Sequence, residues 1–138
     1  MRTRMNKCKW LLVVLLGMAS LTTFAASKEK ADEPKRVYMY GVSVNFNDSV
    51  VYMTDVQYLD SMIINKDGSI QNYANYSIQM KVYLEGMLGE SNQTCAVIYS
   101  DNKKKLEKRY VKMRKRYQTS KNKLLRQIGT DTFRFHKE

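Results

Sequence analysis

The chain has 138 residues, with 24 Lys and Arg against 13 Asp and Glu, and its net charge is +11. This is the length of one compact domain, which excludes a multidomain enzyme, and the apolar content of 43% excludes a fully disordered chain. One His and two Cys exclude almost every metal site built from several such ligands, so we expect no metal and no cofactor.

The first 25 residues have the pattern of a secretory signal peptide. Residues 1–10 carry four basic side chains and no acid, residues 11–24 carry no charge, and Ala25 is a small residue at the expected cleavage site. The uncharged run is too short for a membrane anchor, which needs about 20 apolar residues. The sequence therefore predicts export to the periplasm, the cell envelope or the medium. Cleavage near Ala25 would leave a net charge of +7 and Cys95 as the only thiol, which excludes an internal disulfide.

Two strands are predicted after a charged tether at residues 26–36. Apolar and polar residues alternate over residues 37–46, which is typical of a strand. A polar turn at residues 47–49 precedes residues 50–57, the expected return strand of a hairpin. Residues 58–64 are ambiguous and are a candidate extension of that strand, before a turn that ends at Gly68.

Two helices and three further strands are predicted in the second half of the chain. The first helix would begin at Asn72 or Asn75 and end near Gly86 and Gly89, and its apolar stripe consists of Tyr76, Met80, Tyr83, Leu84, Met87 and Leu88. Residues 94–99 form a continuous apolar run, as expected of a strand covered on both faces. Ser100 or Asp101 would cap the second helix, which extends to about Gln118 with a narrow core face of Leu106, Tyr110, Met113 and Tyr117. Residues 124–128 and 132–136 predict the last two strands.

This element order, β-β-α-β-α-β-β, predicts a single α/β domain over residues 37–138. Strands that are separated by helices favour a parallel core with right-handed crossovers. We expect a two-layer sandwich, in which a mixed four- to five-stranded sheet packs against two helices. The alternative is a three-layer arrangement with the helices on opposite faces.

Three segments resemble a family of small exported bacterial proteins of unknown function. The run YGVSVNFNDSVVYMTDVQ at residues 40–57 is similar to the opening of that family, and NQTCAV at 92–97 and EKRY at 107–110 are similar to later segments. The resemblance covers most of the chain after the predicted signal peptide and implies an envelope or secreted location, with no activity attached. The chain differs from nicotinamide-dependent reductases because no G-x-G-x-x-G follows a strand.

The residues suited to catalysis are few. Cys95 lies in the apolar run, where a free cysteine behaves as a small hydrophobic residue, and His136 lies two residues from the end. Carboxylates such as Asp48, Asp55 and Asp60 would serve in acid–base chemistry only if two of them converged. The ten tyrosines fit the edges of a core. We therefore predict no catalytic residue, and the alternative is a small periplasmic enzyme that uses Asp and Tyr groups.

The strongest local signal is a basic cluster at residues 103–116. Its nine basic residues are Lys103, Lys104, Lys105, Lys108, Arg109, Lys112, Arg114, Lys115 and Arg116, and Glu107 is its only acid. On a helix they would cover the surface outside the core face and would attract an anionic polymer, a membrane surface or an envelope protein. Nucleic acid fits the same surface, although export would confine such binding to experiments in vitro.

An intramolecular alternative exists for this cluster. Residues 26–102 carry a net charge of −4 and residues 103–138 carry +11, so the basic helix could instead balance the acidic first half. We favour a non-enzymatic binding module that uses the basic helix, with the nature of its partner left open.

Overall fold

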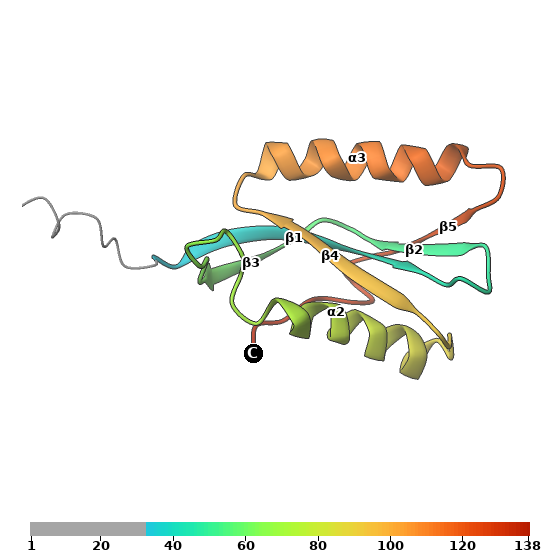
Figure 1. Cartoon of the computed structure of the whole chain (residues 1–138), viewed down its shortest axis with the longest axis horizontal. Coiled ribbons are helices and arrows are strands. Elements are labelled where there is room, and N and C mark those ends of the chain that lie inside the picture. Colours follow the sequence, from blue (N-terminus) through green and yellow to red (C-terminus); the bar gives the residue numbers. More distant parts are fainter. Residues whose placement is uncertain (1–32) are drawn as a thin grey trace, which may run out of the picture. The chain divides into compact units, whose positions relative to one another are not determined.

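A computed structural model describes residues 33–138, so the predicted signal peptide and the first part of the tether lie outside the described residues. Five strands form one sheet: β1 (Lys35–Val44), β2 (Val50–Thr54), β3 (Gln57–Met62), β4 (Thr94–Ser100) and β5 (Leu124–Ile128). The helices are α2 (Tyr73–Val82), which continues as a π-helical turn η1 (Tyr83–Met87), and α3 (Lys103–Thr119) (Figure 1). Lys35 and Arg36 belong to β1, so the predicted tether was two residues too long.

The sheet is mixed and mostly antiparallel. The long central strand β1 pairs antiparallel with β2 and β3 along one side and with β4 along the other, while β5 pairs parallel with β2. A mixed five-stranded sheet with two helices is therefore confirmed, but the expected parallel core is wrong. Both helical crossovers do connect strands of the same direction, from β3 to β4 and from β4 to β5. The antiparallel β1 lies between β4 and the others, so only the β2–β5 pair is parallel.

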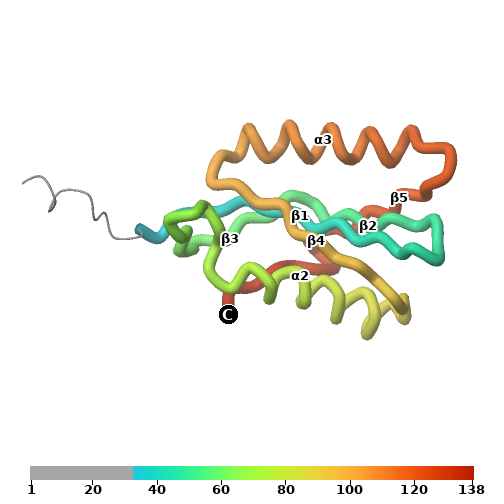
Figure 2. Tube along the Cα trace, in the orientation of Figure 1, coloured from blue at the N-terminus to red at the C-terminus, as the bar shows by residue number. Residues whose placement is uncertain are grey.

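The two helices cover opposite faces of the sheet (Figures 1 and 2). Successive side chains of a strand point to opposite faces, and the neighbours Met39 and Tyr40 in β1 are both fully buried. Met39 belongs to the core under α2, whereas Tyr40 packs in the second core with Leu106 of α3. The two-layer arrangement that we expected is thus wrong, and the three-layer alternative describes the domain.

The last expected strand, residues 132–136, is not a strand. Phe133 and Phe135 are buried on the α2 face, but side-chain amides replace the backbone partners that a strand would need. Gln57 donates to the Phe133 carbonyl (3.0 Å) and accepts from the Phe135 amide (2.9 Å). In the same way, the side chain of Gln79 in α2 donates to the His136 carbonyl (2.8 Å) and accepts from the His136 backbone amide (3.0 Å). The fifth strand is instead β3, which the ambiguous segment supplies.

The first helix departs from the predicted stripe after Leu84. Tyr76, Met80 and Leu84 are buried, but Met87 is 78% exposed and Leu88 is also exposed. The cause is the π-helical turn, in which hydrogen bonds reach five residues back and the following side chains rotate out of register. A side chain on Gly41 would collide with Met80, so glycine at this position lets α2 approach the sheet closely.

Candidate functional site

Helix α3 presents the predicted basic cluster as a regular structure. Asn102 caps the helix, because its side chain accepts a hydrogen bond from the Lys105 amide (3.1 Å). The predicted caps Ser100 and Asp101 were therefore wrong, although the Ser100 hydroxyl accepts from the Asn102 amide. The predicted core face is confirmed. Leu106 is fully buried, and three partly buried residues pack against the same core: Tyr110, Met113 and Tyr117.

All nine basic residues of the cluster are exposed. A helix turns by about 100° per residue, which places Lys104, Lys108 and Lys115 directly opposite the core face. One flank is entirely basic and consists of Lys105, Arg109, Lys112 and Arg116; the other carries Lys103 and Arg114 beside Glu107. The surface formed by the nine basic residues is called the cationic face below. The structure brings them together on one rigid element, as the sequence predicted.

Acidic partners are almost absent from the cationic face within residues 33–138. Its single ion pair joins Lys103 to Glu107 at 3.9 Å, and both side chains are exposed. Three acids of the first half pair with bases outside α3: Asp60 with Arg36, Asp101 with Lys35, and Glu85 with Lys81. Direct contacts in the described part of the chain therefore give no support to the alternative that α3 balances the acidic first half.

The exposed side of α3 offers little apolar surface. Val111 is 61% exposed, and it lines an open groove together with Glu107 and four lysine side chains: Lys104, Lys108, Lys112 and Lys115. The larger apolar side chains of α3 face the sheet and belong to the core. No helix within residues 33–138 combines the length and the apolar content that crossing a bilayer requires.

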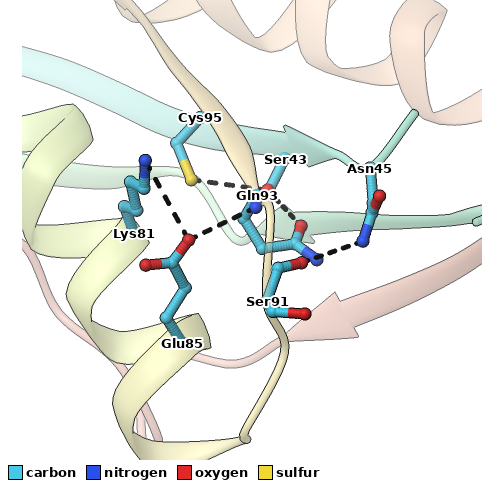
Figure 3. A network of polar contacts seen from close by, with 7 residues as sticks. All are labelled: Ser43, Asn45, Lys81, Glu85, Ser91, Gln93 and Cys95. Atoms are coloured by element: carbon cyan, nitrogen blue, oxygen red, sulfur yellow. Dashed lines mark hydrogen bonds and ion pairs between the residues drawn. The ribbon is translucent and has the colours of Figure 1, made fainter. Parts of the chain in front are cut away.

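Cys95 belongs to a network of polar contacts between β1, β4 and the end of the first helix (Figure 3). Its thiol donates to the Ser43 hydroxyl (3.3 Å), and that hydroxyl donates to the Gln93 side-chain carbonyl (2.6 Å). The backbone N–H of Gln93 donates to the Glu85 carboxylate (3.3 Å), and that carboxylate pairs with Lys81. Burial raises the pKa of the Cys95 thiol, and the hydrogen bond to Ser43 offsets part of that rise. A raised pKa disfavours the thiolate, which agrees with an unreactive cysteine.

The surroundings of Cys95 differ from our expectation in one respect. The strand β4 pairs only with β1 and so lies at an edge of the sheet. Cys95 itself is half-buried, and both Thr94 and Ala96 are exposed. The expectation that this strand is covered on both faces is met at Val97, which packs in the core under α2, and at Ile98, which packs against the core under α3. It is not met at Thr94 and Ala96, because that part of the edge strand extends beyond α3.

The aspartates of the first half do not converge on one site. Asp48 accepts from the Val50 amide and Asp67 from the Ser69 amide, which are turn contacts, as expected. Asp60 pairs with Arg36, and Asp55 accepts from the side chain of Gln127 (2.7 Å). No three His, Cys, Asp or Glu side chains of residues 33–138 are grouped so that they could hold a metal ion.

A cavity that the sequence did not indicate lies between η1 and the β2–β5 edge of the sheet. Its volume is about 480 Å³, and its lining includes Tyr52, Tyr83, Glu90 and Arg126. These residues come from three separate segments of the chain and form no motif, so no signal in the sequence would have joined them.

Comparison with family models, with curated proteins and with solved structures finds no match for the chain. The resemblance to small exported bacterial proteins therefore stays a prediction.

Proposed function

We propose that this protein is a non-enzymatic binding module for extended polyanions and that it contacts them through the cationic face of α3. The observation that carries the proposal is the lack of counter-charges. Eight of the nine basic side chains have no acidic partner within 4.0 Å among the described residues. A concentrated, unpaired positive field attracts anions, and a polyanion gains further from the release of its counterions.

The geometry favours a polymer over a membrane surface. An interfacial helix inserts a wide apolar face into the lipid, whereas the apolar face of α3 is committed to the core through Leu106. The helix has 17 residues and extends over about 26 Å. Lys104 and Lys108 are separated by about 6 Å along the helix axis, a short repeat that suits a polymer with one anionic group per unit.

Heparin is a suitable probe for this proposal. The test variant reverses three charges of the cationic face, Lys104→Glu, Lys108→Glu and Lys115→Glu. The control variant reverses three exposed charges outside α3, Lys66→Glu, Arg134→Glu and Lys137→Glu, so both variants change the net charge equally. We expect the test variant to lose at least about tenfold in affinity and the control to stay within about threefold of the original chain.

Two results would overturn the proposal. Equal losses in both variants would show that only net charge matters, and unchanged binding in the test variant would remove α3 from the contact. Vesicles of anionic phospholipid provide the second arm. Binding to vesicles without binding to heparin would favour a membrane surface over a polymer.

The alternative function, a small enzyme that uses Asp and Tyr groups, has one such pair in its favour, because Asp55 and Tyr110 both accept from the side-chain amide of Gln127 (2.7 and 2.8 Å). This pair lines neither the groove on α3 nor the cavity beside η1. The four aspartates bond to separate partners within the described residues. A reaction would require at least two such groups to converge on one substrate.

We also propose that the protein is exported after cleavage near Ala25. The support is the order of charge, apolar run and small residue in the first 25 residues. Mass spectrometry of the exported protein should find an N-terminus at Ala26 or Ser27. An N-terminus that still contained residues 1–10 would contradict this proposal.

A further inference from the structure

The cavity beside η1 is a second, separate candidate site. Tyr52 and Ile128 line it and belong to the core on the α2 side of the sheet, opposite the face that carries α3. Its volume of about 480 Å³ lies in the range that encloses a small organic ligand. A ligand bound here would leave the cationic face free.

The apolar part of the cavity is formed by packed side chains. Tyr52 is 6% exposed and Ile128 is 5% exposed, so the sheet supplies a buried floor. The ring of Tyr83 packs on Phe133 with 4.9 Å between centroids, which fixes one wall. Leu88 also lines the cavity and is exposed. These side chains suit an apolar or aromatic group of moderate size.

Two opposite charges line the same cavity. Neither Glu90 nor Arg126 forms an ion pair within 4.0 Å among the described residues. Burial is the main cause that raises the pKa of the Tyr52 phenol in the same lining; the Glu90 carboxylate adds to the rise and the Arg126 guanidinium opposes it. A cavity with an unpaired anion, an unpaired cation and an apolar floor complements a small molecule that carries both charges.

The π-helical turn shapes this site. The Glu90 amide donates to the Leu84 carbonyl (3.0 Å), which fixes the backbone of Glu90 against the turn. The turn also carries Tyr83, whose ring forms the fixed wall. Such turns are rare and are frequent at functional sites.

We infer that this cavity binds a zwitterionic small molecule of amino-acid size with an apolar or aromatic side chain. Arg126 receives the carboxylate, Glu90 receives the ammonium group, and the side chain lies against Tyr52 and Tyr83. Arginine is suited to the carboxylate because its planar guanidinium offers two parallel donors.

Three related probes separate the contributions of the two charges. Phenylalanine carries both charged groups, phenylpropanoate lacks the ammonium group, and phenethylamine lacks the carboxylate. Amide NMR titration of the chain should show saturable shifts at Glu90, Gly129 and Thr132 with phenylalanine. Each probe that lacks one charge should bind about tenfold more weakly.

Conservative variants assign each charge to its residue. Arg126→Gln should make phenylalanine and phenethylamine bind equally, and Glu90→Gln should do the same for phenylalanine and phenylpropanoate. Arg134→Gln, a change outside the cavity lining, should leave all three affinities unchanged. The dispersion of the amide spectrum shows in each case that the variant is folded.

Clear results would overturn the inference. Absence of saturable shifts with all three probes would exclude this ligand class, and equal affinities for the three would exclude the charged pair. The variant with Lys104, Lys108 and Lys115 reversed should bind phenylalanine like the original chain. Failure at this cavity therefore leaves the polyanion proposal standing, and the reverse also holds.

Discussion

The two helices pack on opposite faces of one sheet, but they are held in different ways. On one face, α2 and η1 bury Tyr76, Met80 and Leu84, and the C-terminal segment adds Phe133 and Phe135. On the other face, Leu106 is the only fully buried residue of α3. A helix that needs only a narrow stripe for its attachment leaves most of its surface free for charge. The free surface of α3 is charged, whereas α2 and η1 expose apolar side chains, among them Ile78, Val82 and Met87.

The largest expected effect tests whether one residue anchors α3. Leu106→Ala should lower the free energy of unfolding by about 2–5 kcal/mol, because it removes buried methyl groups and leaves a cavity. The matched change Val111→Ala, on the exposed side of the same helix, should change it by less than about 0.5 kcal/mol. Urea unfolding measures both. Similar small effects would contradict the narrow attachment of α3.

The next largest effect concerns the stability of the C-terminal segment, which packs on the α2 face of the sheet. Gln57→Ala removes the partners of the Phe133 carbonyl and the Phe135 amide, both in buried hydrogen bonds, and should cost about 1–3 kcal/mol. Gln79→Ala removes a similar but exposed pair of bonds and should cost clearly less. If the two variants lost the same stability in urea unfolding, burial of the C-terminal segment would not decide its contribution.

The reactivity of Cys95 provides a kinetic test of the α2 face. Because burial raises the pKa of the thiol, its thiolate fraction at neutral pH is smaller in the folded protein than in the unfolded chain. Labelling by a disulfide reagent should therefore be slower in native buffer than in denaturant and should speed up as the pH rises. Stoichiometric labelling of the folded protein within seconds would restore Cys95 as a candidate nucleophile.

The smallest effect concerns the cationic face itself. Reversing Lys104, Lys108 and Lys115 should leave the free energy of unfolding unchanged within about 0.5 kcal/mol, because no described acid pairs with them. If α3 instead balanced the acidic first half, each exposed pair lost would cost roughly 0.2–1 kcal/mol. Thermal or urea unfolding of the triple variant distinguishes the two cases.

Local patterns in the sequence predicted the local elements of this fold. The alternation around Tyr40 and Val42 identified β1, and the spacing of Leu106, Tyr110 and Met113 identified α3. The layer arrangement was not predictable in this way. The face that each helix covers depends on the order of the strands in the sheet, and that order is set by contacts between residues distant in the sequence. The C-terminal segment has the apolar pattern of a strand, and only the positions of Gln57 and Gln79 in space show that side chains bond its backbone.

The same distinction applies to the sites. The cationic face was predictable because its residues are contiguous and share one helix. The cavity was not predictable. The sheet and the π-helical turn bring its residues together, and no residue pattern predicted that turn; the residues are Tyr52, Tyr83, Glu90 and Arg126.

The salt dependence of polyanion binding is the most direct test of the cationic face. A fluorescein-labelled single-stranded oligonucleotide serves as the probe in vitro, since each neutralised phosphate contributes about 0.7 to the slope of log affinity against log salt. If Lys104, Lys108 and Lys115 each contact the polymer, reversing them should make the slope shallower by about 2. The control variant, with Lys66, Arg134 and Lys137 reversed, should keep the original slope. An unchanged slope in the test variant would contradict a contact surface on α3.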